Sequence, residues 1–409
     1  MNSFLFWTII IVILLNFCSE TILNYLNHQF STQPLPEELK GIYDEKKKEE
    51  SQNYQNEKYL FSLWSSIFSV VIILLAFFLN FFAALDEWVR IYVKNETVVS
   101  LAFFGVLFLI SDLLTIPFSL YNIFVIEEKY GFNKVTWKIY LFDKIKTYLM
   151  AFLIGGSVLY AIIYVYSAFG EIFWIMGWLV ITLFSILAIA LYSSVILPLF
   201  NKLKPLEEGQ LKSEIEYYCK KEGYQLKNLY VMDGSKRSTK ANAFFSGLGA
   251  KKKIVLFDTL IVKLSVQEVT AVLAHEIGHY KRKHTLLQLI ISSIQTLILF
   301  VLLGWLLQYN QLSEVLNVET HSFHIAAIVF FLLYSPISML IGIISNTVSR
   351  KNEFEADEYA NVTYSSQHLS SALVKLSVDS LSNLTPHPWY VAVYYSHPTL
   401  SQRLRKLSN

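Results

Sequence analysis

Charged side chains are scarce in this sequence. Only 16% of its 409 residues are Asp, Glu, Lys or Arg, whereas soluble domains carry about 25%. Hydrophobic residues make up 54% of the chain, and the mean hydropathy is +0.42. This composition excludes a disordered chain and argues against a wholly soluble enzyme. We therefore expect a membrane protein.

Cysteine is almost absent as well. Cys18 and Cys219 are the only two, and they lie far apart in segments of unlike composition. This excludes both a disulfide framework and a cysteine-based metal site. The sequence also lacks internal repeats, which argues against a transporter built from two related halves.

The sequence instead contains several long apolar runs. A helix needs about 20 mostly apolar residues to cross the hydrocarbon core of a bilayer. The first run lacks the basic flank and the small-residue cleavage site of a signal peptide, so we interpret it as a retained span. The predicted fold is mostly α and polytopic, with seven spans: 4–23, 61–84, 98–120, 148–166, 172–196, 286–307 and 323–344.

Lysine and arginine indicate how these spans are oriented. With the N-terminus outside, 32 of the 34 basic residues fall in inward-facing segments, and the outward segments hold only Arg90 and Lys94. Basic residues concentrate on the cytosolic side of membrane proteins. We therefore predict an outside N-terminus and a cytosolic C-terminus.

This orientation divides the chain into four parts. The first, 1–196, holds five spans and the cytosolic loops 24–60 and 121–147. A cytosolic α+β segment follows, with short strand candidates at 228–232, 243–248 and 253–257. The last two spans and a second cytosolic segment complete the chain. These three later parts are 197–285, 286–344 and 345–409.

Some polar residues interrupt the apolar runs. Four such residues would be costly against lipid, so we expect them to face the bundle interior: Asn80, Asp112, Gln288 and Gln295. They could line water or make hydrogen bonds between helices, and the sequence favours neither.

A metal-binding pattern lies in the first cytosolic segment. Residues 274–279 read Ala-His-Glu-Ile-Gly-His. Histidines four positions apart project from one helix face, about 6 Å apart, so His275 and His279 can reach one Zn²⁺ ion. Glu276 can accept a proton from metal-bound water and pass it to a leaving amine. Gly278 is costly inside a helix and indicates that something packs closely there.

A catalytic zinc site has three protein ligands and one open position. The acidic stretch 350–360 follows the last predicted span. On a helix Glu353 and Asp357 would share a face, whereas Glu355 would point to the other side. One carboxylate could bind the metal while the other holds a ligand histidine. A solvated acidic helix face is the alternative interpretation.

The distance from the spans places the metal near the membrane. His279 precedes the sixth predicted span by seven residues and Glu353 follows the seventh by nine, which is about 10 and 14 Å of helix. We therefore expect both helices to continue from membrane helices and the metal to lie at the cytosolic membrane face.

An ordered set of motifs runs through nearly the whole chain, and in it the sequence resembles the membrane zinc metalloproteases called CAAX prenyl protease type 1. The resemblance implies a barrel of seven helices around a water-filled chamber, capped by the zinc domain. The motifs are 120–122 (Leu-Tyr-Asn), 127–133 (Glu-Glu-Lys-Tyr-Gly-Phe-Asn), 242–245 (Asn-Ala-Phe-Phe), 254–260 (Ile-Val-Leu-Phe-Asp-Thr-Leu), 275–279, 353–357 (Glu-Phe-Glu-Ala-Asp) and 395–404 (Tyr-Ser-His-Pro-Thr-Leu-Ser-Gln-Arg-Leu).

The resemblance also implies the roles of the site residues. His275, His279 and Glu353 match the ligands of one zinc ion per chain, Glu276 the catalytic base, and Asp357 a partner of the ligands. The remaining matches contact the substrate or the reacting carbonyl. Asn242 matches a contact to the substrate backbone on an edge strand beside Phe244, and His397 and Arg403 match residues that steady the tetrahedral intermediate and orient the site.

The implied activity is removal of the last three residues from proteins that bear a prenylated cysteine. The expected partners are a peptide or protein substrate and the lipid bilayer, with no nucleic acid. The tail 406–409 (Lys-Leu-Ser-Asn) lacks the dilysine pattern of endoplasmic-reticulum members, so we predict a bacterial inner-membrane protein. The alternatives are a membrane quality-control metallopeptidase that acts on non-prenylated peptides, and a transporter or lipid-binding protein with an incidental motif.

Overall fold

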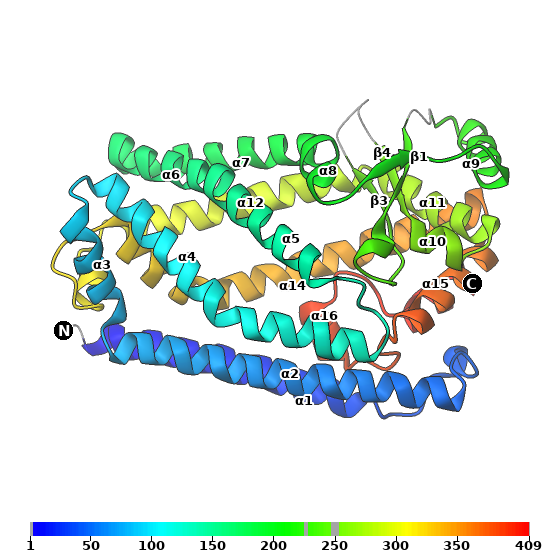
Figure 1. Ribbon diagram of the computed structural model, residues 1–409, viewed down its shortest axis with the longest axis horizontal. Coiled ribbons are helices and arrows are strands. Elements are labelled where there is room, and N and C mark those ends of the chain that lie inside the picture. Colours follow the sequence, from blue (N-terminus) through cyan, green and yellow to red (C-terminus); the bar gives the residue numbers. More distant parts are fainter. Residues whose placement is uncertain (1–2, 225–227, 247–252, 409) are drawn as a thin grey trace.

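The computed structural model describes residues 3–224, 228–246 and 253–408. Long helices run side by side along the longest axis, and a small sheet with short helices covers one end of this bundle (Figure 1). The N-terminus lies at the end remote from the sheet, and the C-terminus lies at the end that carries it. We call the sheet and these short helices, which fall within 203–281 and 366–408, the sheet domain.

The helices of the bundle come from both halves of the chain. Short π-helical segments at 122–127, 151–155 and 192–196 continue α4, α5 and α7. The bundle helices are α1 (Ser3–Phe30), α2 (Glu45–Phe78), α3 (Phe81–Tyr92), α4 (Glu96–Tyr121), α5 (Trp137–Met150), α6 (Gly156–Phe169), α7 (Phe173–Leu191), α8 (Leu197–Phe200), α12 (His284–Leu306), α13 (Gln311–Glu314) and α14 (Phe323–Thr363).

Six helical stretches in the described part of the chain are long and apolar enough to cross a membrane. One of them, Trp137–Phe200, contains two of the seven predicted spans. It turns at Gly170, whose φ of +49° is left-handed and ends α6 before α7 begins at Phe173. Membrane-spanning helices are thus confirmed, and the count of seven stays a prediction.

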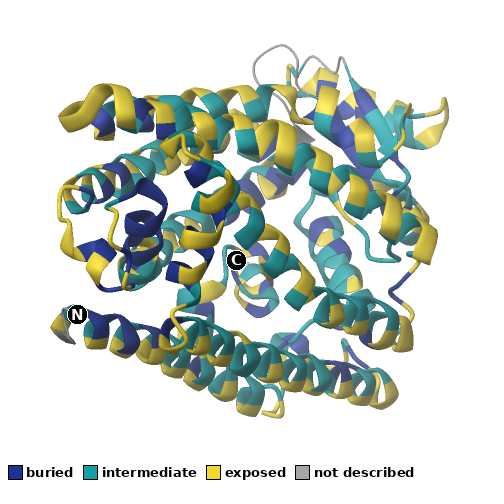
Figure 2. Cartoon of the chain, turned by 60° about the vertical axis from the view of Figure 1, so that its left-hand side comes forward, coloured by how far each residue is buried: buried dark blue, intermediate teal, exposed yellow. Residues whose placement is uncertain are grey.

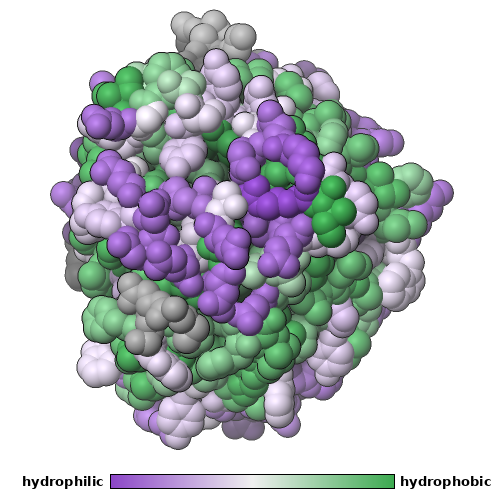
Figure 3. Space-filling model, turned by 90° about the vertical axis from the view of Figure 1, so that its left-hand side faces the viewer, coloured by the Kyte–Doolittle hydropathy of each residue, from purple (hydrophilic) through white to green (hydrophobic). Residues whose placement is uncertain are grey.

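One end of this apolar bundle carries a polar surface. Hydrophilic side chains gather on the end nearest α3, and hydrophobic side chains cover the flanks (Figure 3). Buried residues concentrate around α3, the start of α14 and the sheet domain, whereas the middle of the long helices is intermediate or exposed (Figure 2). This distribution is typical of a protein whose flanks face lipid.

Polar residues inside the bundle take different roles. Asp112 on α4 accepts hydrogen bonds from Lys144 and Tyr148 on α5, so it links two helices. Gln295 lines an open pocket between α12 and α14, whereas Gln288 on α12 is exposed. Asn80 was expected within the second span, but α2 ends at Phe78, and Asn80 has a left-handed φ of +54° in the turn to α3. That expectation was wrong because the apolar run continues through the turn into α3.

The sheet domain contains a four-stranded mixed sheet in the order β1-β2-β4-β3. β2 and β4 are parallel, and the two outer strands pair with them antiparallel, so β3 is an edge strand among the described residues. The elements are β1 (Leu203–Pro205), α9 (Gln210–Lys221), β2 (Leu229–Met232), β3 (Ala243–Ser246), β4 (Lys253–Phe257), α10 (Asp258–Lys263), α11 (Val266–Lys281), α15 (Ser366–Asp379), α16 (Pro388–Tyr394) and α17 (Leu400–Ser408). The predicted strand 243–248 extends at its end beyond the described residues.

The start and the orientation of α11 follow from its sequence. Glu268 N–H donates to Ser265 Oγ at 3.3 Å and Ser265 N–H donates to Glu268 Oε2 at 2.8 Å, which forms a capping box. Leu273 and Ile277 are fully buried in the core that α11 shares with β4. This face holds α11 against the sheet and leaves the histidines on another side.

The two helices that carry the metal-binding pattern meet the membrane bundle differently. α14 is one continuous helix of 41 residues, so Glu353 and the seventh predicted span belong to the same element. α11 ends at Lys281, and α12 begins at His284 after Lys283, whose φ of +59° is left-handed. The expected continuity is therefore right for α14 and wrong for α11, because the left-handed residue breaks the helix.

Gly278 on α11 packs closely against α14. A Cβ atom at Gly278 would lie 3.0 Å from Ala356 Cα and 3.1 Å from the Ala356 carbonyl oxygen. Both are backbone atoms, so they could give way only if the whole helix moved. The close packing that the glycine indicated is thus the contact with α14.

We expect Gly278→Ala to destabilise the protein. Overpacking costs about 1–3 kcal/mol, which exceeds the gain of about 1 kcal/mol that alanine brings to a helix. Gly105→Ala in α4 is the matched control, since a Cβ there meets no atom within 4 Å. Thermal unfolding in detergent should show a lower midpoint for Gly278→Ala only, and equal midpoints would contradict the tight contact.

Candidate metal centre

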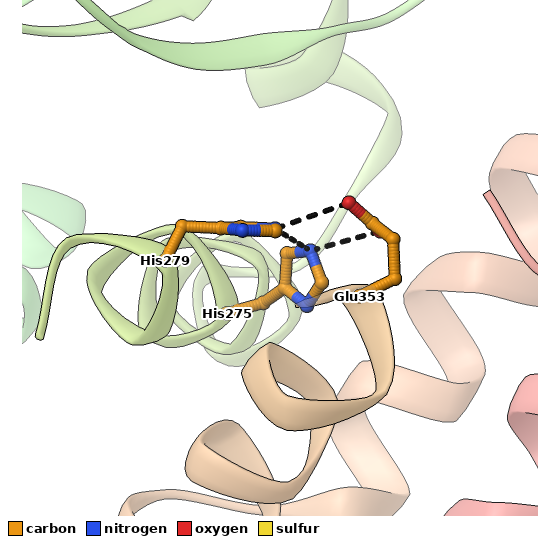
Figure 4. A group of neighbouring side chains, drawn as sticks. All are labelled: His275, His279 and Glu353. Carbon is orange, nitrogen blue, oxygen red and sulfur yellow. Dashed lines mark hydrogen bonds and ion pairs between the residues drawn. The ribbon is translucent and has the colours of Figure 1, made fainter. Parts of the chain in front are cut away.

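Two histidines of α11 face each other at the end of the bundle. His275 is 6% exposed, and its Nε2 atom lies 3.2 Å from Nε2 of His279. Figure 4 shows both rings turned toward a glutamate from the neighbouring helix. That residue is Glu353 on α14, which is 5% exposed.

The glutamate completes a triangle of possible ligand atoms. Glu353 Oε1 lies 3.1 Å from His279 Nε2, and Glu353 Oε2 lies 3.5 Å from His275 Nε2. Candidate ligand atoms of the three residues all lie within 4.8 Å of one another. Glu353 lies 74 or more positions after the two histidines in the sequence, and the contact of α11 with α14 brings the three residues together.

The triangle has the size that a tetrahedral metal requires. Bonds of about 2.0–2.1 Å at tetrahedral angles put ligand atoms about 3.3–3.4 Å apart, close to the three distances above. Glu353 Oε2 is also buried without any hydrogen-bond donor among the described residues. Such an atom is costly unless a cation compensates it, and Arg403 Nη1, at 3.9 Å, is too far away to donate a hydrogen bond to it. The residues present therefore fit a metal ion.

Asp357 and Arg403 support the first histidine. Asp357 is fully buried one turn after Glu353, and its Oδ1 atom lies 2.8 Å from His275 Nδ1. Arg403 of α17 donates to both carboxylate oxygens of Asp357, at 2.6 and 2.8 Å. This bidentate pair holds the aspartate in place, and the aspartate in turn fixes the ring of His275 with Nε2 toward the triangle.

A second set of partners lies behind His279 and was missed from the sequence. His284, at the start of α12, has its Nδ1 atom 2.9 Å from His279 Nδ1. Its other nitrogen lies 3.2 Å from Glu355 Oε2. Glu355 points away from the triangle, as expected from its place on the helix, but it contacts this histidine. A histidine five positions after His279 would not face it on a continuous helix, so the spacing gave no signal.

Glu276 lies between the two histidines in sequence. Its side chain is half-buried. Burial raises the pKa of the Glu276 carboxyl above its ordinary value, and the adjacent histidines act in the opposite direction.

His397 stands at the open side of the triangle. Its side chain is 64% exposed, and its Nε2 atom lies 3.5 Å from Glu353 Oε1. The residue belongs to the segment between α16 and α17, which also brings Arg403 to the site. The C-terminal segment therefore contributes one exposed imidazole, that of His397, and one largely buried guanidinium, that of Arg403.

The predicted substrate residues lie on and beside the edge strand. Asn242 is exposed, and its side chain accepts a hydrogen bond from Ala243 N–H at 2.8 Å. The ring of Phe244 packs edge-on against Tyr192 and Phe257. Phe244 thus packs against the face of the sheet, and its contact with substrate stays a prediction.

Comparison with protein families gives two adjoining matches. Residues 24–202 match the family described as CAAX prenyl protease N-terminal, five membrane helices. Residues 205–409 match peptidase family M48. Together these matches span both the bundle and the sheet domain.

Individual relatives agree over nearly the full length. CAAX prenyl protease 1 of Saccharomyces cerevisiae is 34% identical over 96% of this chain and 92% of its own. The CAAX prenyl protease 1 homolog of Homo sapiens is 33% identical over 92% of this chain and 89% of its own. The crystal structure of S. mikatae Ste24p superposes with a TM-score of 0.92 at 35% identity, over 98% of both chains. This chain therefore belongs to the CAAX prenyl protease 1 relatives within peptidase family M48 and is a multi-pass membrane metalloprotease.

Proposed function

We propose that this chain is a zinc endopeptidase that removes the C-terminal tripeptide from proteins bearing a prenylated cysteine. The observation that carries the proposal is the triangle of His275, His279 and Glu353, whose size fits a tetrahedral ion. In this proposal the three residues hold one Zn²⁺ per chain. The named relatives are CAAX prenyl proteases, and the substrate class is carried over from them.

The metal, when bound, supplies a water of lowered pKa and polarises the scissile carbonyl. Glu276, beside the first ligand, would accept a proton from the attacking water and pass it to the leaving amine. His397 is exposed at the open side, where an N–H donor can stabilise the negative charge that develops on the carbonyl oxygen. Arg403 keeps Asp357, and through it His275, in position.

We further propose that the substrate binds as an added strand. β3 has one edge without a partner strand among the described residues. It lies beside α11, and Asn242 precedes it with an exposed side chain. Strand addition uses backbone hydrogen bonds, so it tolerates many side chains. Selectivity for a lipid-modified cysteine would then come from the bundle rather than from the sheet domain.

The proposed bundle is a barrel of seven spans around a chamber. Only 6–22% of the most apolar window of each candidate span is buried, so these helices present surface to lipid, to a chamber or to both. Support for a chamber comes from an open pocket of about 380 Å³ between α12 and α14. Several of its lining residues are polar: Gln295, Thr296, Tyr334, Ser338, Ser345 and Asn346.

The site is proposed to face the cytosol. The distribution of basic residues supports this orientation, and termini at opposite ends of the bundle agree with an odd number of spans (Figure 1). The bacterial inner membrane stays a prediction from the C-terminal tail. The three relatives named above are all eukaryotic proteins.

We expect Glu353→Ala to lose bound zinc, because only two protein ligands remain. The loss of affinity should exceed the about 10- to 100-fold that removal of an outer partner costs. Glu358→Ala is the control, since Glu358 lies on the same helix with an exposed side chain. Elemental analysis after gel filtration measures the metal. A wild-type zinc content in Glu353→Ala would remove Glu353 from the ligand set.

The activity itself is tested with a farnesylated peptide that ends in a CAAX sequence. Purified protein should release the C-terminal tripeptide, and a chelator should stop the reaction. Glu276→Gln should retain zinc and lower kcat by about 10²–10⁴-fold, because only the base is lost. The peptide without its farnesyl group serves as the matched substrate. Equal cleavage of both peptides would favour the quality-control alternative, and cleavage that resists the chelator would contradict a metalloprotease.

Orientation is tested by cysteine labelling in a background of Cys18→Ser and Cys219→Ala. Thr320, in the segment between the last two predicted spans, and Lys406, in the C-terminal segment, are both exposed. A membrane-impermeant maleimide should label Thr320→Cys in intact cells and Lys406→Cys only after permeabilisation, because basic residues place the C-terminus inside. The reverse pattern would move the zinc site to the other compartment.

A further inference from the structure

His284 and Glu355 are not needed as ligands or as a base in the mechanism above, yet they are well ordered around the site. The side chain of His284 is only 6% exposed, and that of Glu355 is 34% exposed. His284 Nδ1 lies 2.9 Å from His279 Nδ1, and His284 Nε2 lies 3.2 Å from Glu355 Oε2. Three side chains, from α11, α12 and α14, thus form one continuous chain of hydrogen bonds.

The direction of this chain follows from which nitrogen faces the metal triangle. His279 turns Nε2 toward His275 and Glu353, so its proton must sit on Nδ1 when Nε2 binds a metal. Nδ1–H then donates to His284 Nδ1, which accepts only if His284 carries its own proton on Nε2. That Nε2–H donates to the Glu355 carboxylate. Every donor has an acceptor, and a single tautomer of each ring satisfies the chain.

We propose that His284 and Glu355 are positioning residues that fix the tautomer and ring orientation of the zinc ligand His279. This proposal rests on the zinc site proposed above. A ligand histidine generally donates its second N–H to a carboxylate, a carbonyl or water. Here the acceptor is a neutral imidazole, and the carboxylate acts on the ligand through it.

A break in the helix makes the contact possible. On a continuous helix a residue five positions on would be turned by about 140° from His279. Lys283, with φ of +59°, ends that geometry and starts α12 in a new direction. The left-handed conformation of a lysine is costly, and here it brings His284 back beside His279.

The two ligand histidines are therefore held in different ways. His275 contacts the buried carboxylate of Asp357 directly, at 2.8 Å, and Arg403 holds that carboxylate. His279 reaches Glu355 only through His284. The position of His284 also distinguishes it from a ligand, because it meets Nδ1 of His279, whereas the metal triangle is formed by Nε2.

The test measures zinc affinity by chelator competition on metal-stripped protein that has been refilled with zinc. His284→Leu and Glu355→Ala should each bind zinc about 10- to 100-fold more weakly than the wild type. The double variant should be no weaker than the poorer single variant, because both act through one chain. Glu355→Gln keeps an acceptor oxygen for His284 and should recover most of the affinity. Glu358→Ala, on an exposed side of α14, is the matched control.

Thermal unfolding of the metal-free proteins separates positioning from general stability. We expect the Glu355 variants to have the unfolding midpoint of the wild type. If metal-free His284→Leu unfolds at a lower temperature, the difference in zinc affinity between Glu355→Ala and Glu355→Gln tests the positioning role instead. Two results would overturn this proposal. One is a zinc affinity of Glu355→Ala within about twofold of wild type, and the other is a double variant in which the affinity losses of the single variants multiply. A wild type that binds no zinc would instead contradict the proposed function, so the two failures are distinguishable.

Discussion

The contact of Gly278 with Ala356 sets the distance between α11 and α14, and the metal triangle depends on that distance. A Cβ atom at Gly278 would lie 3.0–3.1 Å from backbone atoms of α14, so a side chain there would push the two helices apart. The histidines lie on one helix and Glu353 on the other. Their ligand atoms come within 3.1–3.5 Å of one another. A shift of either helix would change all three distances together.

The same two helices connect the site to the membrane bundle. α14 extends without a break from the apolar bundle to Glu353 and Asp357. α11 instead belongs to the core of the sheet domain, through residues such as Leu273 and Ile277. The site is therefore assembled between one element anchored in the bundle and one anchored in the sheet domain. This arrangement suits a protease whose substrate approaches from the membrane surface.

Local sequence patterns predicted much of this arrangement. Apolar runs gave the long helices, and the spacing of His275, Glu276 and His279 gave the metal pattern, because both depend on contacts within a few residues. Glu353 and Asp357 emerged from helical periodicity and from the resemblance to a known family. The position of β3 at the sheet edge was also implied by that resemblance.

Other features depend on tertiary contacts that no local pattern reveals. The break at Lys283 could not be predicted, since lysine has no preference for a left-handed conformation. His284 and Glu355 were therefore not expected to meet. Asp112 has its partners on another helix, and Asn80 lies in a turn that the apolar run conceals. In each case packing between elements overrides the pattern within one element.

X-ray absorption spectroscopy at the zinc edge tests the central claim most directly, because it counts the imidazole ligands of the bound metal. The account predicts two imidazoles and oxygen ligands, with bonds of about 2.0–2.1 Å. The two imidazoles would be His275 and His279, with Glu353 among the oxygen ligands. A third imidazole would make His284 or His397 a ligand, and a single imidazole would break the triangle. Either result would contradict the metal centre described here.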